Sequence, residues 1–108
     1  VFCADAVFEY RGEEVTPLSA ICQLMHNLEK YPTTQHRVQN VLYEVEGDNA
    51  TGETYCLASH LLDSGQGLEK IDMAITYSDR LQRTADGWRI AHRVFNLLWS
   101  QTGPVDQV

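Results

Sequence analysis

The sequence is poor in basic residues and has no long hydrophobic run. Eight lysines and arginines stand against fifteen acidic residues, which gives a formal charge of −7 and a pI of about 4.9. A surface that binds nucleic-acid phosphates needs clustered basic residues, so nucleic acid is not an expected partner. Crossing a bilayer takes a run of ~20 apolar residues, which is absent, so we expect a soluble protein without membrane contact.

Cysteine and cofactor motifs are scarce as well. The three cysteines, Cys3, Cys22 and Cys56, are an odd number without CxxC spacing, which favours neither a disulfide framework nor a zinc site. This usage predicts a reducing, cytoplasmic compartment. The sequence also lacks a glycine-rich phosphate loop, an HExxH motif and a nucleophile elbow, so it predicts no cofactor and no metal.

The order of the predicted elements is a strand, a helix and then four long strands. Thr16 and Pro17 are typical of a helix start, and apolar residues at helical spacing predict an amphipathic helix over 17–30. Those apolar residues are Leu18, Ile21, Cys22, Met25 and Leu28. Alternating patterns predict strands over 7–11, 34–46, 50–63, 69–83 and 88–100, and the last residues, 101–108, predict a flexible tail.

These elements favour one domain over residues 1–108 with an α+β fold. A chain of this length can bury a single modest core. Long antiparallel strands with only one helix to cover them must curl around their apolar face. We therefore predict a strongly curved antiparallel sheet wrapped around the helix, with a pocket on its concave face.

Two histidines are predicted to be neighbours on this concave face. Side chains alternate along a strand, so His36 and Asn40 share one face, as do Cys56 and His60 on the next strand. Counted from the turn at 47–48, position 36 pairs near position 59, which places the two imidazoles close together. One ring could act as a base and the other as a donor. The alternative is that each ring only satisfies a buried hydrogen bond.

Other polar residues also have a structural and a functional interpretation. Tyr10 could donate a hydrogen bond to a substrate oxygen or simply cover the core. Arg93 lies between apolar neighbours and needs an acidic partner if it is buried, and Asp79 on the preceding strand is the candidate. His26 is predicted to lie on the outer face of the helix, and His92 in a strand without an evident polar partner.

Apolar residues on the last strand and on the middle hairpin predict two surfaces. Alternation in the last strand predicts four core residues: Trp88, Ile90, Val94 and Leu98. Four large residues are expected on the face opposite the pocket: Tyr43, Val45, Tyr55 and Leu57. Because large exposed apolar groups are costly, this outer face favours a homo-oligomer, either a dimer or a trimer.

Three stretches of the sequence carry a family resemblance over about residues 1 to 99. These are "VFCADAVFEYRG", "TTQHRVQNVLYEVEGDNATGETYCLASH" and "YSDRLQRTADGWRIAHRV". They resemble the SnoaL-like branch of the nuclear transport factor 2-like superfamily, whose fold is a cone of curved sheet and helices. Within that superfamily the sequence is similar to scytalone dehydratase and the bile-acid dehydratases, which remove water from ring compounds without a cofactor.

The resemblance implies roles for individual residues. It implies His36 as general acid or base, His60 as a positioning donor and Tyr10 as a polariser of a carbonyl. Asp79 and Arg93 match pocket positions less specifically. With Asn40 and Cys56 on the predicted pocket face, these four are the expected substrate-binding residues. The expected substrate is a small apolar cyclic ketone or alcohol, transformed by a lyase or isomerase reaction.

The sequence departs from this family pattern at its N-terminus. The related enzymes have an N-terminal helix with a Tyr-Asp pair, and the given sequence begins after the position of that helix. Three explanations are open: a fragment, a partner subunit that supplies the cover, or a domain that only binds. The alternative function is therefore a noncatalytic ligand-binding or assembly subunit, like the small subunit of aromatic-ring dioxygenases.

Overall fold

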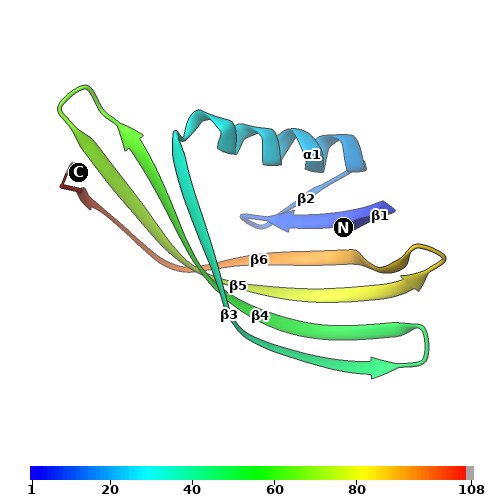
Figure 1. Ribbon diagram of the computed structural model, residues 1–108. Coiled ribbons are helices and arrows are strands. Elements are labelled where there is room, and N and C mark those ends of the chain that lie inside the picture. The colour runs from blue at the N-terminus through cyan, green and yellow to red at the C-terminus, as the bar shows by residue number, and fades with distance from the viewer. Residues whose placement is uncertain (107–108) are drawn as a thin grey trace.

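The computed structural model describes residues 1–106 and contains one six-stranded sheet with one short helix (Figure 1). Its elements are β1 (Phe2–Tyr10), β2 (Glu13–Val15), α1 (Leu18–His26), the 3-10 turn η1 (Asn27–Lys30), β3 (Thr33–Glu46), β4 (Asn49–Asp63), β5 (Leu68–Thr84) and β6 (Gly87–Pro104). The predicted α+β class and order of long strands are confirmed. No helix among the described residues is long and apolar enough to span a membrane.

The sheet order is β2-β1-β6-β5-β4-β3, with β1 and β6 parallel and all other neighbours antiparallel. Strand β2 was not predicted: the residues after Gly12 turn back and pair with β1 instead of ending the sheet. Figure 1 shows the long strands bending together, with α1 above the β1 edge and the chain then crossing to start β3 at the opposite edge.

The helix is shorter than predicted and is oriented differently. Pro17 takes the N-cap position and α1 ends at His26, where a single 3-10 turn continues the chain. Ile21 is buried, and Leu18 and Leu24 pack beside it, whereas Cys22 and Met25 of the predicted apolar face are exposed. A nine-residue helix is about 14 Å long, while the molecule extends over 52 Å. Helix α1 therefore covers only part of the sheet.

Two clusters of buried residues form the core on one side of the sheet. The first joins α1 to β1 and β6 through Cys3, Ala6, Phe8, Ile21 and Ala91. The second lies farther along the sheet and contains Cys56, Ala58 and Ile75. Phe95 packs against both clusters and connects them. We call the side of the sheet that α1 covers the inner side, and the opposite side the outer side.

The strand register assigns side chains to these two sides. A single row of ladder partners crosses the inner side through Phe8, Arg93, Asp79 and Gly52. Alternation along β4 from Gly52 then places Cys56, Ala58 and His60 on the inner side as well.

A bulge in β3 overturns part of the predicted facing. The register shifts between Val38 and Val41, so both residues lie on the inner side although they are three positions apart. Tyr43 and Val45 follow Val41 onto the inner side, where the prediction had them on the outer face. A Cβ atom added to Gly52 would run into the Tyr43 ring, which confirms that the ring lies over the inner side of β4.

In the last strand, β6, the predicted facing also fails because the strand register shifts. Shifts in the β5–β6 register fall between Ala74 and Ile75 and between Arg80 and Leu81. Of the four residues predicted as core, only Ile90 is buried, while Trp88 and Val94 are half-buried and Leu98 is exposed. Strand β6 also continues through Pro104, so residues 101–104 are sheet where a flexible tail was predicted. The final two positions of that tail, 107–108, lie outside the described residues.

The docking of α1 depends mainly on one side chain. We expect Ile21→Ala to lower the free energy of unfolding by about 2–4 kcal/mol, because Ile21 is 1% exposed and its loss leaves a cavity between α1 and β1. Met25→Ala is the control, since Met25 is 39% exposed and its loss should cost well under that amount. Urea titration measures both, and equal losses would contradict this account of the core.

Candidate functional site

His36 and His60 meet on the inner side of the sheet. Their Nε2 atoms are 3.2 Å apart, and the rings stand edge to face with centroids 5.3 Å apart. His36 comes from the exposed edge strand β3, whereas His60 on β4 is only 1% exposed. The predicted proximity of the two histidines is confirmed, with position 36 pairing with Ala58. Their catalytic roles stay a prediction.

The environment of His60 keeps its ring neutral. Burial lowers the pKa of His60 from its ordinary value, and the neighbouring His36 and Lys30 lower it further. Tyr31, just after η1, packs on the His60 ring with centroids 4.8 Å apart. The Nδ1 atom of His60 is buried and has no hydrogen-bond partner among the described residues. Only its Nε2 atom is therefore engaged, and that contact is with His36.

This pair of rings can hold one additional proton. Two neutral imidazoles 3.2 Å apart share a single hydrogen bond, in which one Nε2–H donates and the other Nε2 accepts. Burial disfavours the charged form of His60. The pair thus joins one exposed ring to one buried ring that disfavours charge.

A second polar cluster lies on the inner side, between β5 and β6. Arg93 donates two hydrogen bonds of 2.8 Å to Asp79, through Nε and Nη2 to the two carboxylate oxygens. The predicted pairing of these residues is confirmed. Burial opposes the charge of Arg93, but the bonds and the charge of Asp79 prevail and raise its pKa. The guanidinium also lies over the Tyr77 ring, 4.3 Å from its centroid.

Two further hydroxyl groups, those of Thr54 and Tyr77, lie close to this ion pair. The hydroxyl oxygen of Thr54, which pairs with Tyr77 across the sheet, is buried and has no hydrogen-bond partner among the described residues. Burial raises the pKa of Tyr77, so its phenol stays protonated. The cluster can therefore offer neutral hydroxyl groups to a ligand oxygen.

The structure places Cys56 and Tyr10 on the inner side but not beside the histidine pair. Cys56 is buried between the two polar clusters, and burial raises the pKa of its thiol. Tyr10 packs on Phe95, with ring centroids 5.1 Å apart. Its strand β1 is separated from β4 by β6 and β5, so Tyr10 is three strands away from His60.

Asn40 is not brought to the histidine pair, contrary to its predicted placement. It lies in the β3 bulge and lines a hollow of about 220 Å³ together with Leu42, Glu53 and Tyr55. A larger, open hollow of about 450 Å³ is lined by Gly52 and Asp79 and, for the most part, by Leu42, Glu44, Thr51, Glu53, Ser78, Arg80 and His92. By register, the side chains of this larger group point to the outer side, whereas the predicted pocket faced inward. The inner side near His36 is an open surface with an exposed Val38.

The two remaining histidines contribute to surface ion pairs. His26 contacts Glu29 at 2.9 Å on the exposed face of the helix, as its predicted outward orientation requires. His92 was expected to have no polar partner, but its Nε2 atom lies 2.8 Å from Glu9 Oε2 on the parallel strand β1. The sequence could not show this pair, because its members are 83 positions apart.

Two residues of the inner side were not predicted from the sequence. Tyr31 follows the 3-10 turn and contacts the His60 ring, and no local sequence pattern predicts that contact. Tyr77 could have been found, since it lies two positions before Asp79 and therefore on the same side of β5. No cluster of three or more metal-ligating side chains occurs within residues 1–106.

Comparison with known proteins identifies a family. The sequence pattern that defines a SnoaL-like domain matches residues 1–94. The uncharacterized protein Rv2910c of Mycobacterium tuberculosis is 29% identical over 100 residues, which are 87% of this chain and 65% of that protein. The chain thus spans just under two thirds of the length of this curated relative.

Solved structures share the fold. A candidate scytalone dehydratase from Novosphingobium aromaticivorans DSM 12444 superposes with a TM-score of 0.81 at 16% identity, over 99% of this chain and 76% of the other. A type 2 hexachlorocyclohexane dehydrochlorinase, LinA, superposes with a TM-score of 0.78 at 20% identity, over 100% of this chain and 73% of the other. At these identities the likeness shows the fold: a curved, open sheet of the nuclear transport factor 2-like type.

The buried His60 makes stability depend on pH. Its pKa is lowered in the folded protein, so below the ordinary value of about 6.5 the unfolded chain binds more protons than the folded one. The free energy of unfolding should therefore be highest above this pH and fall as the pH drops toward the folded pKa. His60→Gln should remove this part of the slope.

Urea titrations at several pH values between about 5 and 8 give the dependence of the unfolding free energy on pH for each variant. His26→Gln is the control, because His26 is exposed, and it should keep the wild-type slope. An unchanged slope in His60→Gln would contradict the assignment.

Proposed function

This chain belongs to the SnoaL-like family, and we propose that it is a lyase or isomerase that moves protons on a small, largely apolar ring compound by acid–base catalysis. The observation that carries the proposal is the contact between His36 and His60, 3.2 Å apart on the inner side of the sheet. The dehydratase and dehydrochlorinase folds that resemble this chain support an elimination reaction.

The proposed base is His36. When His36 Nε2–H donates to Nε2 of the neutral His60, the His36 ring is held in one tautomer and its Nδ1 lone pair is free. Once Nδ1 takes a proton, the same hydrogen bond stabilises the imidazolium without any rearrangement. His60 accordingly acts as an acceptor and not as the donor that the family resemblance implied, since a protonated His36 can only donate.

The elimination balances without a cofactor. For a cyclic ketone with a hydroxyl group β to the carbonyl, His36 Nδ1 takes the proton from the intervening carbon, and the electron pair of that C–H bond becomes the ring double bond. The C–O bond breaks, and the hydroxide leaves with the proton that His36 returns. The products are the unsaturated ketone and water, and His36 is restored. An isomerase reaction uses the same base and returns the proton to a different carbon.

The inner side supplies complementary groups for such a ligand. Val38 and Met73 offer an apolar surface near the histidine pair. The Arg93–Asp79 cluster, Cys56 and Tyr10 lie farther along the same side and take no part in the proposed proton transfer, because they are not beside the histidine pair. Asn40 has no part in this proposal, because it lies at the outer hollow.

Location and assembly are extensions of the same proposal. All three cysteines are free thiols, which supports a cytoplasmic, reducing compartment. The outer side carries exposed Tyr55 and Trp99, and by register Leu57 lies beside them, which supports a homo-oligomer formed through this side.

The proposal is tested by deuterium incorporation from solvent. A panel of cyclic ketones, with and without a β-hydroxyl group, is incubated with the protein in D₂O, and exchange at the carbon next to the carbonyl is followed by NMR. Proton abstraction is thereby detected whether or not a group leaves. We expect exchange with at least one ketone, and His36→Gln should slow it by about 10²-fold or more.

The matched control is His26→Gln, the same change at an exposed histidine that lies outside the site. It should exchange at the wild-type rate. Undiminished exchange in His36→Gln, or no exchange with any ketone by the wild-type protein, would reject the proposal and favour a noncatalytic ligand-binding or assembly subunit.

A further inference from the structure

We propose that Arg37 is a positioning residue: through Ser59 and Asp72 on the outer side it holds strand β3 in the register at which His36 meets His60. This inference rests on the proposed function for its catalytic consequence. Its structural content concerns the geometry of the histidine pair and can be measured in the free protein.

The need for such an anchor follows from the position of β3. It is an edge strand, paired only with β4, and its residues are exposed along its whole length. The ladder that contains His36 is short: it begins at Thr33, directly after Pro32, and is interrupted by the shift that follows Val38. A short ladder at an exposed edge is a weakly specified piece of sheet.

The contact between the two histidines is sensitive to this register. The direct partner of His36 across the ladder is Ala58, and His60 is paired with Thr34. The two imidazoles therefore meet diagonally, over a backbone separation of about 7–8 Å. A small shift or rotation of β3 relative to β4 changes the distance between the two imidazoles before the strand pairing is lost.

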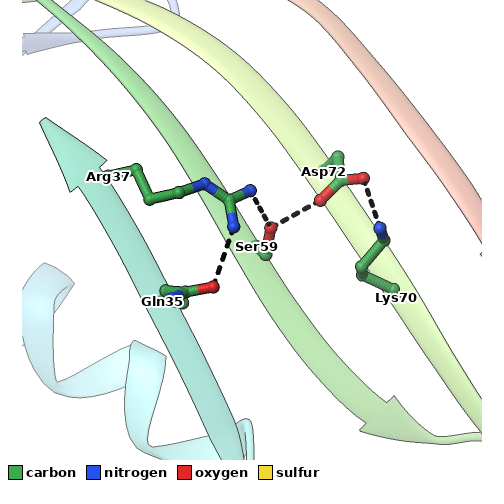
Figure 2. Close-up of polar contacts among 5 residues, drawn as sticks. All are labelled: Gln35, Arg37, Ser59, Lys70 and Asp72. Atoms are coloured by element: carbon green, nitrogen blue, oxygen red, sulfur yellow. Dashed lines mark hydrogen bonds and ion pairs between the residues drawn. The ribbon is translucent and has the colours of Figure 1, made fainter. Parts of the chain in front are cut away.

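A chain of polar contacts on the outer side fixes this register (Figure 2). Arg37 Nη1 donates to Gln35 Oε1 at 2.8 Å, and Nη2 donates to Ser59 Oγ at 3.0 Å. Ser59 Oγ in turn donates to Asp72 Oδ1 at 2.6 Å, and Lys70 Nζ lies 2.9 Å from Asp72 Oδ2. As Figure 2 shows, the chain runs from β3 across β4 to β5.

On β4 and β5, the side chains at the far end of this row of polar contacts are firmly placed. Ser59 is buried, and the Asp72 side chain is 18% exposed. The hydrogen bond from Ser59, followed by the contact with Lys70, lowers the pKa of Asp72, so its carboxylate stays charged. Ser59 donates to this carboxylate, which orients its oxygen lone pairs toward Arg37. The exposed edge strand β3 is thus tied to two interior strands.

The placement of Arg37 makes the anchor specific for His36. Gln35 and Arg37 are the two chain neighbours of His36, and their side chains are bonded to each other on the outer side. Because side chains alternate, the backbone that they hold is the one from which His36 projects inward. The guanidinium of Arg37 donates hydrogen bonds to its own strand and to the next strand at the same time, which the ammonium group of a lysine cannot reproduce.

The test compares four variants of the full-length protein: Arg37→Ala, Ser59→Ala, Arg37→Lys and the control Arg83→Ala. Arg83 forms an exposed ion pair with Asp48 at the distant hairpin turn and carries the same charge as Arg37. Ser59→Ala interrupts the row of polar contacts between Arg37 and Asp72 without changing any charge. The first readout is the NMR cross-relaxation signal between ring protons of His36 and His60 in the free protein.

We expect this inter-ring signal to weaken in both Arg37→Ala and Ser59→Ala and to match the wild type in Arg83→Ala. Where exchange activity is measurable, kcat should fall about 10- to 100-fold in the first two variants with a smaller change in KM, because misplacement by about 1 Å affects the proton transfer. Arg37→Lys should recover part of the signal and of the kcat.

Wild-type inter-ring signals in Ser59→Ala would overturn the inference, and so would full recovery in Arg37→Lys, since charge alone would then account for any effect of Arg37. Failure of the proposed function looks different. In that case the wild-type protein shows the inter-ring signal but no exchange activity, and the inter-ring signals of the variants still decide whether Arg37 positions His36.

Discussion

The pairing of β3 with β4 is the constraint on which the candidate site depends. The buried His60 is fixed by its place on β4, which is paired on both sides, by the Tyr31 ring and by the core around Ala58. His36 belongs to an exposed edge, and it reaches His60 only while that edge keeps its register. The site thus combines a buried half and an exposed half, and the proposed base belongs to the exposed one.

The two sides of the sheet serve different purposes in this arrangement. The inner side carries the core, the histidine pair and the Arg93–Asp79 cluster, so its polar groups are few and specific. The outer side carries the polar chain from Lys70 to Gln35 and the exposed Tyr55 and Trp99. Because each strand presents residues to both sides, the register that is fixed outside also determines the chemistry inside.

Much of the fold could be predicted from the sequence, because alternation and turn residues are local signals. They gave the first strand, the helix, the four long strands, the α+β class and the proximity of His36 and His60. The pairing of Arg93 with Asp79 followed from the same alternation and the need to neutralise a buried charge. In β3 before the bulge and in β4, where the strand alternation is regular, facing and pairing were both correct.

The errors fall where the regular period is broken or the contact is distant in sequence. The bulge after Val38 reverses the facing of Tyr43 and Val45 and takes Asn40 away from the histidines, yet nothing in the residue types marks it. Shifts in β6 similarly expose Leu98. Contacts such as Tyr31 with His60 and His92 with Glu9 depend on how separate segments are brought together.

The central claim is that a neutral His60 holds His36 in the tautomer that leaves Nδ1 free to accept a proton. Long-range ¹H–¹⁵N correlation spectra of the imidazole nitrogens between neutral and mildly acidic pH test it most directly. The account predicts that His36 carries its proton on Nε2 and gains the next one on Nδ1, while His60 keeps an unprotonated Nε2 throughout. A proton on Nε2 of His60, or protonation of His60 before His36, would contradict it.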